Sequence, residues 1–440
     1  MDWHNATTWG AGGVVPTIGD ITLPENSKIL VSKTINQVLG LITVPISSQL
    51  IFGEDSDGIA MDAIGFEVIG ALIAGSESCR LKTPLSITLH GTRPNDVVAN
   101  PKPPSFKGIS VTGVLQMHGK RYYRTWTRLA RNASPGDMFL ELQHPVNWEK
   151  GQDLVLVTTA VKDSRDWHQN EQLTVDRVEP GPEEGAPAVV YLTSPVQKVH
   201  LANSGYQAEV GLLSRMITVQ GAFDDSEPTD PDPGGCEGKH WIFGDNGSPC
   251  VNTELTGYGG HIMVHEGGKG YVEGVELHRM GQTNVLGRYP MHFHKLGNIC
   301  MDCYFRDSSV HSSYYRCISL HGTNGMLVSE NVVSDLSASL CFSLDLSFLL
   351  SHKILIHVCS LLMFISKAYD VTGYCYYLED GVEEDNTISF NLAAFIHMIG
   401  TPAHGNAQST HLVYQSNNIT LPADVRNLRD SLEFFCFVLM

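Results

Sequence analysis

The sequence predicts an all-β fold, a right-handed parallel β-helix of the pectin-lyase type preceded by a glycine-rich β-domain. Short apolar runs of strand length alternate with turn signals along most of the chain, and no window shows a clean helical period. The 440 residues include 42 glycines, which suits many turns. From Tyr258 onward, short strands ending in polar or glycine turns recur, and such units bury their apolar sides only by stacking. The ragged period leaves a β-sandwich as the alternative.

Five segments follow from these patterns. Residues 1–121 are expected to form the glycine-rich β-domain, and 122–221 continue as a connecting β segment. The acidic stretch "DDSEPTDPDPGGCEG" is rich in proline and glycine, which predicts a loop over 222–257. The β-helix is expected over 258–425, and 426–440 form a tail of different character.

Stacked coils also predict which side chains are buried. Asparagines at turn-like places, Asn331, Asn386 and Asn391, are expected to ladder their amides from one rung to the next. The core is expected to include the following apolar residues of the third segment: Phe293, Ile318, Leu320, Val328 and Ile388.

Charge and cysteine content narrow the class of partner. The net charge of −18, from 47 acidic and 29 basic residues, disfavours nucleic acid and anionic lipid as partners. Cys300 and Cys303 form a close pair with no second pair at zinc-finger spacing, so a zinc site is disfavoured and we predict no metal site from the cysteines. A disulfide between Cys236 and Cys250 would close the acidic loop in a secreted protein.

The N-terminal residues have neither the basic start nor the apolar run of a signal peptide. The protein is then either intracellular or lacks its natural N-terminus in this chain. Four glycosylation sequons, at Asn5, Asn132, Asn246 and Asn418, favour the secretory route. We therefore expect an extracellular or cell-surface location, with the N-terminal signal missing here.

Two sets of motifs resemble a known family. The stretches "WGAGGVVPTIGDITLPENSKILV" and "LIFGEDSDGIAMDAIGFEVIGALIAGSESC" resemble the G8 domain. "GRYPMHFH" and "YLEDGVEEDNTISFNLA" resemble the β-helix that follows it in fibrocystin-L, the cell migration-inducing hyaluronan-binding protein and the transmembrane hyaluronidase. The resemblance implies a cell-surface β-helix protein, with hyaluronan handling in one branch. The motifs are closer to those of the fibrocystin-L branch. For that branch the resemblance implies no defined reaction.

One segment departs from this pattern. Joining Asn331 directly to Tyr369 would restore an uninterrupted rung, yet residues 334–368 intervene. A membrane span needs about 20 apolar residues, and this run carries His352 and Lys353 near its middle. We expect a segment foreign to the fold, such as a retained intron, that packs poorly against the coils.

The histidines carry the main chemical signal. Seven of the 19 lie between His261 and His321, more than twice the number that even spacing would give. On a strand, His292 and His294 project to one face and Met291 and Phe293 to the other. The alternative is that histidines in solenoid turns only satisfy backbone groups.

These histidines suggest a polysaccharide site. We expect His292, His294 and Asp380 as catalytic groups in proton transfer, and His294, His321 and Asp380 in line on successive coils. Substrate contacts are expected from Arg288, His321 and Glu379. The acidic run around Glu379 offers a calcium site as another role, or is simply a solvated turn.

Two functions remain open at this point. The first is a non-catalytic surface or secreted module that binds an extracellular polysaccharide, hyaluronan included, or a cell-surface protein. The second is a hyaluronan-depolymerising glycosidase.

Overall fold

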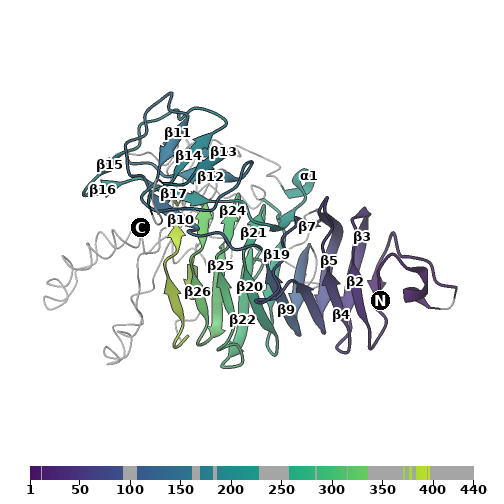
Figure 1. Ribbon diagram of the computed structural model, residues 1–440. Helices are drawn as coiled ribbons and strands as arrows, with labels where there is room; N and C mark the ends of the chain where they lie inside the picture. Colours follow the sequence, from purple (N-terminus) through teal and green to yellow (C-terminus); the bar gives the residue numbers. More distant parts are fainter. Residues whose placement is uncertain are drawn as a thin grey trace, which may run out of the picture.

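The computed structural model shows an elongated, almost entirely β-stranded protein (Figure 1). Among the described residues, helix is confined to the single turns η1 (Ala6–Trp9) and α1 (Phe223–Ser226), and no helix is long and apolar enough to cross a membrane. The structure describes residues 1–10, 12–92, 107–160, 169–181, 186–226, 257–282, 285–314, 316–334, 370–371, 376–378, 383–393 and 395–396.

One long face of the coil is an eight-stranded sheet in which every pair is parallel. Parallel pairing throughout excludes the β-sandwich, whose strands pair antiparallel. In spatial order the strands are β2 (Lys28–Val31), β4 (Gln49–Phe52), β6 (Ala71–Ala74), β9 (Val114–His118), β20 (Lys269–Glu273), β23 (Tyr304–Arg306), β26 (Leu327–Ser329) and β30 (Thr387–Ser389).

The other faces belong to one 14-stranded parallel sheet that divides at β5 (Ile59–Val68). The first half of this strand pairs with β7 (Leu85–Leu89), and its second half pairs with β8 (Gly108–Val111). Two arms then run along the coil. The first contains β8, β19 (His261–Val264), β22 (Met291–Gly297), β25 (Ile318–Thr323) and β29 (Tyr376–Leu378), and the second β7, β18 (Ile217–Gly221), β21 (Val275–His278), β24 (Ser309–His311), β27 (Val332–Ser334) and β31 (Leu392–Ala393).

The remaining strands of the coil lie at its ends. At the N-terminal end, β1 (Ile21–Thr22) pairs parallel with β3 (Ile35–Val44), which in turn pairs with β5. At the other end, β28 (Asp370–Val371) pairs parallel with β32 (Phe395–Ile396).

The N-terminal and C-terminal strands build one coil with one core. β8 pairs with β5 on one side and with β19 on the other, and β9 likewise joins β6 to β20. The predicted all-β parallel β-helix is confirmed, and the structure adds that the glycine-rich strands are rungs of the same coil. Four predicted core residues are fully buried, namely Phe293, Ile318, Leu320 and Val328, and Ile388 packs at the margin of the core.

The predicted asparagine ladder forms between Asn331 and Asn391, whereas Asn386 bonds backbone groups instead. Asn331 and Asn391 are fully buried, and Asn391 Oδ1 accepts hydrogen bonds from the backbone N and the Nδ2 of Asn331, both at 2.9 Å. Asn386 bonds the backbone of Met326 and Thr323 in the preceding rung. Buried amides that satisfy backbone groups from rung to rung fix the register of the stack.

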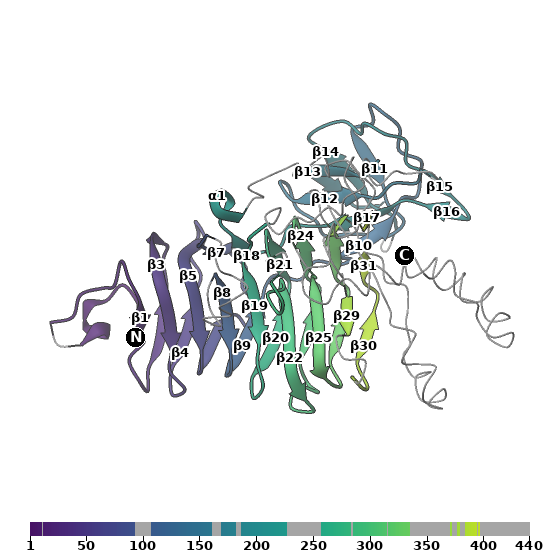
Figure 2. The ribbon, with the colours of Figure 1, turned by 180° about the vertical axis from the view of Figure 1, so that it is seen from behind.

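The described residues between β9 and β18 leave the coil and form a separate antiparallel unit, here called the module (Figure 2). It has its own core, and its six main strands pair antiparallel. These strands are β10 (Trp126–Arg128), β17 (Glu209–Leu212), β12 (Asp153–Leu156), β13 (Glu171–Glu179), β14 (Val189–Leu192) and β11 (Phe139–Glu141), with a side hairpin of β15 (Ala202–Asn203) and β16 (Tyr206–Gln207). The domain boundaries drawn from the sequence remain a prediction.

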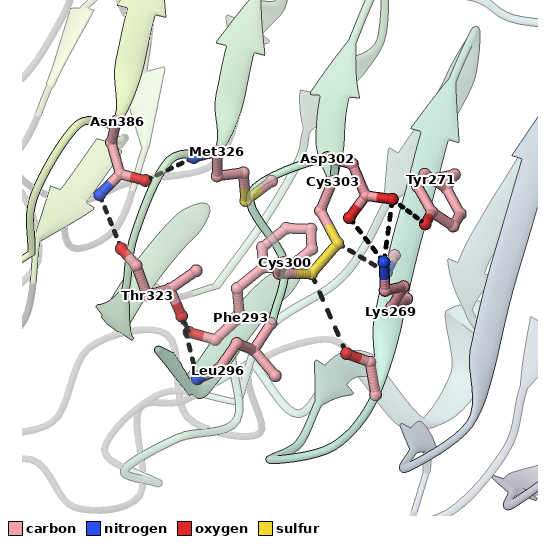
Figure 3. The surroundings of a disulfide bond; sticks show 12 residues. Lys269, Tyr271, Phe293, Leu296, Cys300, Asp302, Cys303, Thr323, Met326 and Asn386 are labelled. Carbon is pink, nitrogen blue, oxygen red and sulfur yellow. Dashed lines mark hydrogen bonds and ion pairs between the residues drawn. A yellow bond between two sulfur atoms is a disulfide. The ribbon is translucent and has the colours of Figure 1, made fainter. Parts of the chain in front are cut away.

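The close cysteine pair forms a disulfide in the turn between β22 and β23 (Figure 3). Cys300 and Cys303 are buried, with Cα atoms 4.9 Å apart, and Gly270 N donates to Cys303 Sγ at 3.4 Å. The disulfide closes the turn itself, and the hydrogen bond from Gly270 ties the turn to the preceding rung. Such a short loop contributes about 2 kcal/mol by chain entropy. Cys236 and Cys250 lie outside the described residues.

Candidate functional site

The outer side of β22 carries the two histidines of the "MHFH" strand. Their ring centroids lie 5.1 Å apart, while Met291 and Phe293 are buried in the core on the other side. The register places His294 opposite His321 on β25, one rung further along. Alternation along the strand therefore brings the histidines together on one side of the coil, as the sequence indicated.

Three of these side chains form the partly exposed part of the surface. His265, His294 and His321, here called the imidazole trio, are each neither buried nor fully exposed. The His294 ring lies 4.7 Å from the His321 ring and 6.1 Å from the His265 ring, centroid to centroid. Burial lowers the pKa of His265, with a smaller contribution from the cationic Arg288, so this imidazole is neutral at pH 7.

A carboxylate lies next to the trio. Glu383 is partly buried, and its Oε1 accepts a hydrogen bond of 2.9 Å from the backbone N of Gly322, the residue after His321. Glu383 comes from the acidic run that the sequence marked, although the expected neighbours were Glu379 and Asp380. Those two residues lie outside the described part of the chain, so their roles and their alignment with His321 remain predictions.

His292 is enclosed in the wall of the coil. Only 1% of it is exposed, its Nδ1 donates to Gly287 O at 3.0 Å, and its ring lies 4.7 Å from the Tyr289 ring. Burial holds the pKa of His292 well below its ordinary value, and the neighbouring histidines lower it further. The structure therefore gives His292 the surroundings of a neutral residue that fixes the loop before β22, and its catalytic role remains a prediction.

Arg288 is also buried, with 8% of its surface exposed, where the sequence analysis expected a substrate contact. Its Nη1 lies 2.7 Å from Nε2 of the fully buried His261, which leaves His261 Nε2 as the acceptor. The His261 ring in turn lies over Gly108, where an added Cβ would come within 2.1 Å of it. Burial lowers the pKa of the Arg288 guanidinium. A substrate role for Arg288 would require this wall to open.

A second group of histidines from the same stretch lies on the other arm of the 14-stranded sheet. His278 and His311, on β21 and β24, stack with centroids 4.6 Å apart, and His311 Nε2 lies 2.9 Å from Glu276 Oε1. Burial, His311 and Arg279 lower the pKa of His278 to about 2. Sequence reasoning missed Glu276, although its position two residues before His278 on one strand was a usable signal.

Two of the four predicted glycosylation sites lie among the described residues. Asn5 and Asn132 are exposed, although each side-chain oxygen already accepts a backbone hydrogen bond, from Thr7 and Ala202 respectively. Asn246 and Asn418 lie outside the described residues. Within the described residues no three His, Cys, Asp or Glu side chains are placed to hold a metal ion. The calcium hypothesis rests on the undescribed part of the acidic run and remains a prediction.

Comparisons with known families match both parts of the coil. Residues 8–130 match the G8 domain, and residues 257–345 and 359–435 match the CEMIP beta-helix. The interruption between 345 and 359 lies within the segment predicted to be foreign to the fold, almost all of which is outside the described residues.

Curated relatives extend over nearly the whole chain. Protein rliB of Dictyostelium discoideum is 35% identical over 432 residues, which is 96% of this chain and 32% of that protein. Human fibrocystin-L is 27% identical over 423 residues, 90% of this chain and 9% of that protein. The chain thus spans a third or less of the length of these relatives.

Among solved structures, the tailspike gp61 of Pseudomonas phage phi297 is similar over 64% of this chain and 40% of its own, with 11% identity and a TM-score of 0.20. The Gp54 tailspike of Acinetobacter baumannii bacteriophage AP22, solved with a capsular saccharide, has a TM-score of 0.18 over 71% and 42% of the two chains, with 9% identity. The chain therefore joins a segment similar to the G8 domain to a segment similar to the CEMIP beta-helix, the pairing that the sequence motifs indicated.

Proposed function

We propose that this protein is a cell-surface or secreted β-helix protein that binds an extracellular glycan through the imidazole trio and Glu383. The observation that carries the proposal is the placement of the three imidazoles on neighbouring rungs at a partly exposed edge. Neighbouring parallel strands lie about 4.8 Å apart, so the trio presents ring nitrogens at a repeat similar to the length of one sugar unit. A glycan chain lying along the coil axis would meet one imidazole on each rung.

The chemistry of the trio suits hydroxyl and carboxylate groups. A neutral imidazole offers one N–H donor and one nitrogen acceptor, which is what a sugar hydroxyl needs. Glu383 adds an acceptor beside His321. Sites built to hydrogen-bond hydroxyl groups discriminate strongly against ligands that lack them.

The cysteines support the proposed location. A buried disulfide such as Cys300–Cys303 persists in oxidising compartments and is rare in the cytosol. The similarity to fibrocystin-L supports the same extracellular or cell-surface placement.

A hyaluronan-depolymerising glycosidase is the second candidate, favoured by the position of Glu383 beside the trio. Most glycosidases need two carboxyl groups, one as acid and one as base or nucleophile. Glu383 would supply one, and Glu379 or Asp380 would supply the other. The partner-protein alternative has no comparable observation in its favour.

Incubation with size-defined hyaluronan, chondroitin and neutral dextran separates the candidates. We expect retention of at least one polysaccharide without shortening. If hyaluronan is shortened, the chain is a glycosidase, and Glu383→Gln should then abolish cleavage while Glu384→Gln, an exposed neighbour, should not. Failure to retain or cleave any of the three would contradict both functions.

A further inference from the structure

The module rests on one corner of the coil, here called the corner column. The column holds one residue in the left-handed conformation after each of four stacked strands of the eight-stranded sheet: Gly274 (φ 67°), Asp307 (φ 50°), Glu330 (φ 56°) and Phe390 (φ 52°). Backbone hydrogen bonds join each corner to the next rung, from Gly274 N to Arg306 O, from Asp307 N to Ser329 O and from Glu330 N to Ser389 O.

The module donates one hydrogen bond to each of the last three corner carbonyls. Arg215 Nε donates to Asp307 O at 2.7 Å. Thr125 Oγ1 donates to Glu330 O at 2.7 Å. The indole N–H of Trp126 donates to Phe390 O at 2.8 Å. The two ends of the module, where the chain leaves the coil and returns to it, are therefore hydrogen-bonded to three consecutive rungs.

Apolar side chains pack beside these three hydrogen bonds. Val155 and Leu213 form a buried cluster with Val332 and Leu392 of the coil. An added Cβ at Gly211 would come within 2.8 Å of both Val332 and Leu392, so the module backbone lies directly on the coil surface. This contact excludes water from the edge of the corner column.

Two acidic residues occupy adjacent corners at this contact, where Arg121 of the module pairs with the Asp307 carboxyl and Thr125 bonds the Glu330 backbone. Asp307 is buried and Glu330 is partly buried, on consecutive rungs. Burial, together with the charge of Asp307, raises the pKa of Glu330 to about 7, against the opposing effect of Arg124 and Arg121. Burial, together with the nearby Glu273 carboxyl, also raises the pKa of Asp307.

Charged groups of the coil and of the module surround the two carboxyls. Glu273 is held ionised, with its pKa lowered to about 2, by ion pairs with Arg80 and Arg306, both at 2.8 Å. Arg121 Nε lies 3.1 Å from Asp307 Oδ2, which favours the charged form of Asp307. Arg215, whose pKa burial lowers to about 10, faces Asp307, Glu276 and Tyr122 and stays charged.

We propose that the contact between the module and the corner column is an acid-stabilised latch, closed by a proton on Glu330 and loosened when that proton is lost. The sign follows from linkage. The docked state raises the pKa of Glu330 above its ordinary value near 4.5, so the contribution is complete below about pH 4.5 and is lost as the pH rises through about 7. The module would then hold firmly in acidic surroundings and open more readily at neutral pH and above.

Hydrogen exchange of the intact chain tests the latch. Amides of β17 and of residues 125–128 should lose protection by up to about tenfold for each pH unit between about 4.5 and 7 and then level off, after correction for intrinsic exchange. Amides of β22, in the core of the coil, should show no such loss. Glu330→Gln, which cannot ionise, should keep β17 protected across the range, while the exposed Glu266→Gln control should behave as wild type.

Hydrogen exchange of the wild-type protein alone can contradict the proposal. Constant protection of β17 between about pH 4.5 and 7 would contradict it, as would a loss shared equally by β22, which would mean global unfolding. An unchanged pH dependence in Glu330→Gln would assign the effect to another group.

Discussion

The two imidazoles of the "MHFH" strand lie 5.1 Å apart on one side of the coil yet have opposite surroundings. His292 is 1% exposed and hydrogen-bonded to the loop that precedes its own strand. His294, two residues later, lies at the partly exposed edge with His265 and His321. One motif therefore supplies both a residue that holds the wall and a residue that can meet a ligand. Residue type and strand position alone do not distinguish the two roles.

Replacing His292 tests the structural half of this comparison. His292→Ala should lower the free energy of unfolding by about 3 kcal/mol, because it leaves a cavity beside Tyr289 and removes the bond to Gly287. Chemical denaturation measures the loss. A change under about 0.5 kcal/mol would show that the site is not a packed wall.

The Cys300–Cys303 disulfide is expected to stabilise the turn after β22. Replacing both Cys300 and Cys303 by serine should cost about 2 kcal/mol, the chain-entropy contribution of a short closed loop. Reducing agent should lower the stability of wild type but not of the double variant. Equal sensitivity of both proteins to reductant would place the labile crosslink elsewhere.

Acid should weaken the protein through its buried neutral histidines. The pKa of His278 and of His292 is lowered in the folded state, so the unfolded chain binds more protons below about pH 6.5. Stability should fall by about 1.4 kcal/mol per pH unit for each such histidine, partly offset by Glu330, whose raised pKa has the opposite sign. Denaturation at pH 7, 6 and 5 measures the slope, and His278→Phe should reduce it. An identical slope in that variant would mean that His278 is not buried neutral.

Sequence reasoning predicts those features that depend on short-range periodicity. The parallel coil, the inward Phe293 and Leu320, the asparagine ladder and the shared side of His292 and His294 all follow from alternation and repeat. The burial of His292 and Arg288 does not, because it depends on how Gly287 and Tyr289 fold over the strand.

Contacts between residues far apart in the sequence could not be predicted from it either. The bond from Thr125 to Glu330 joins residues 205 positions apart, and no local pattern signals it. The pairing of Glu276 with His311 likewise needs the register between two rungs. These contacts define the second histidine group and the corner column, which the sequence analysis did not find.

The most direct test of the central claim is the affinity of the His294→Ala/His321→Ala double variant for the polysaccharide that wild type retains. We expect a loss of at least about tenfold, since each imidazole contributes roughly one hydrogen bond to the ligand, with unfolding free energy changed by less than about 1 kcal/mol. His4→Ala, an exposed histidine at the N-terminal end, should leave both quantities unchanged. Wild-type affinity in the double variant would contradict the account, because the imidazole trio would then not contact the glycan.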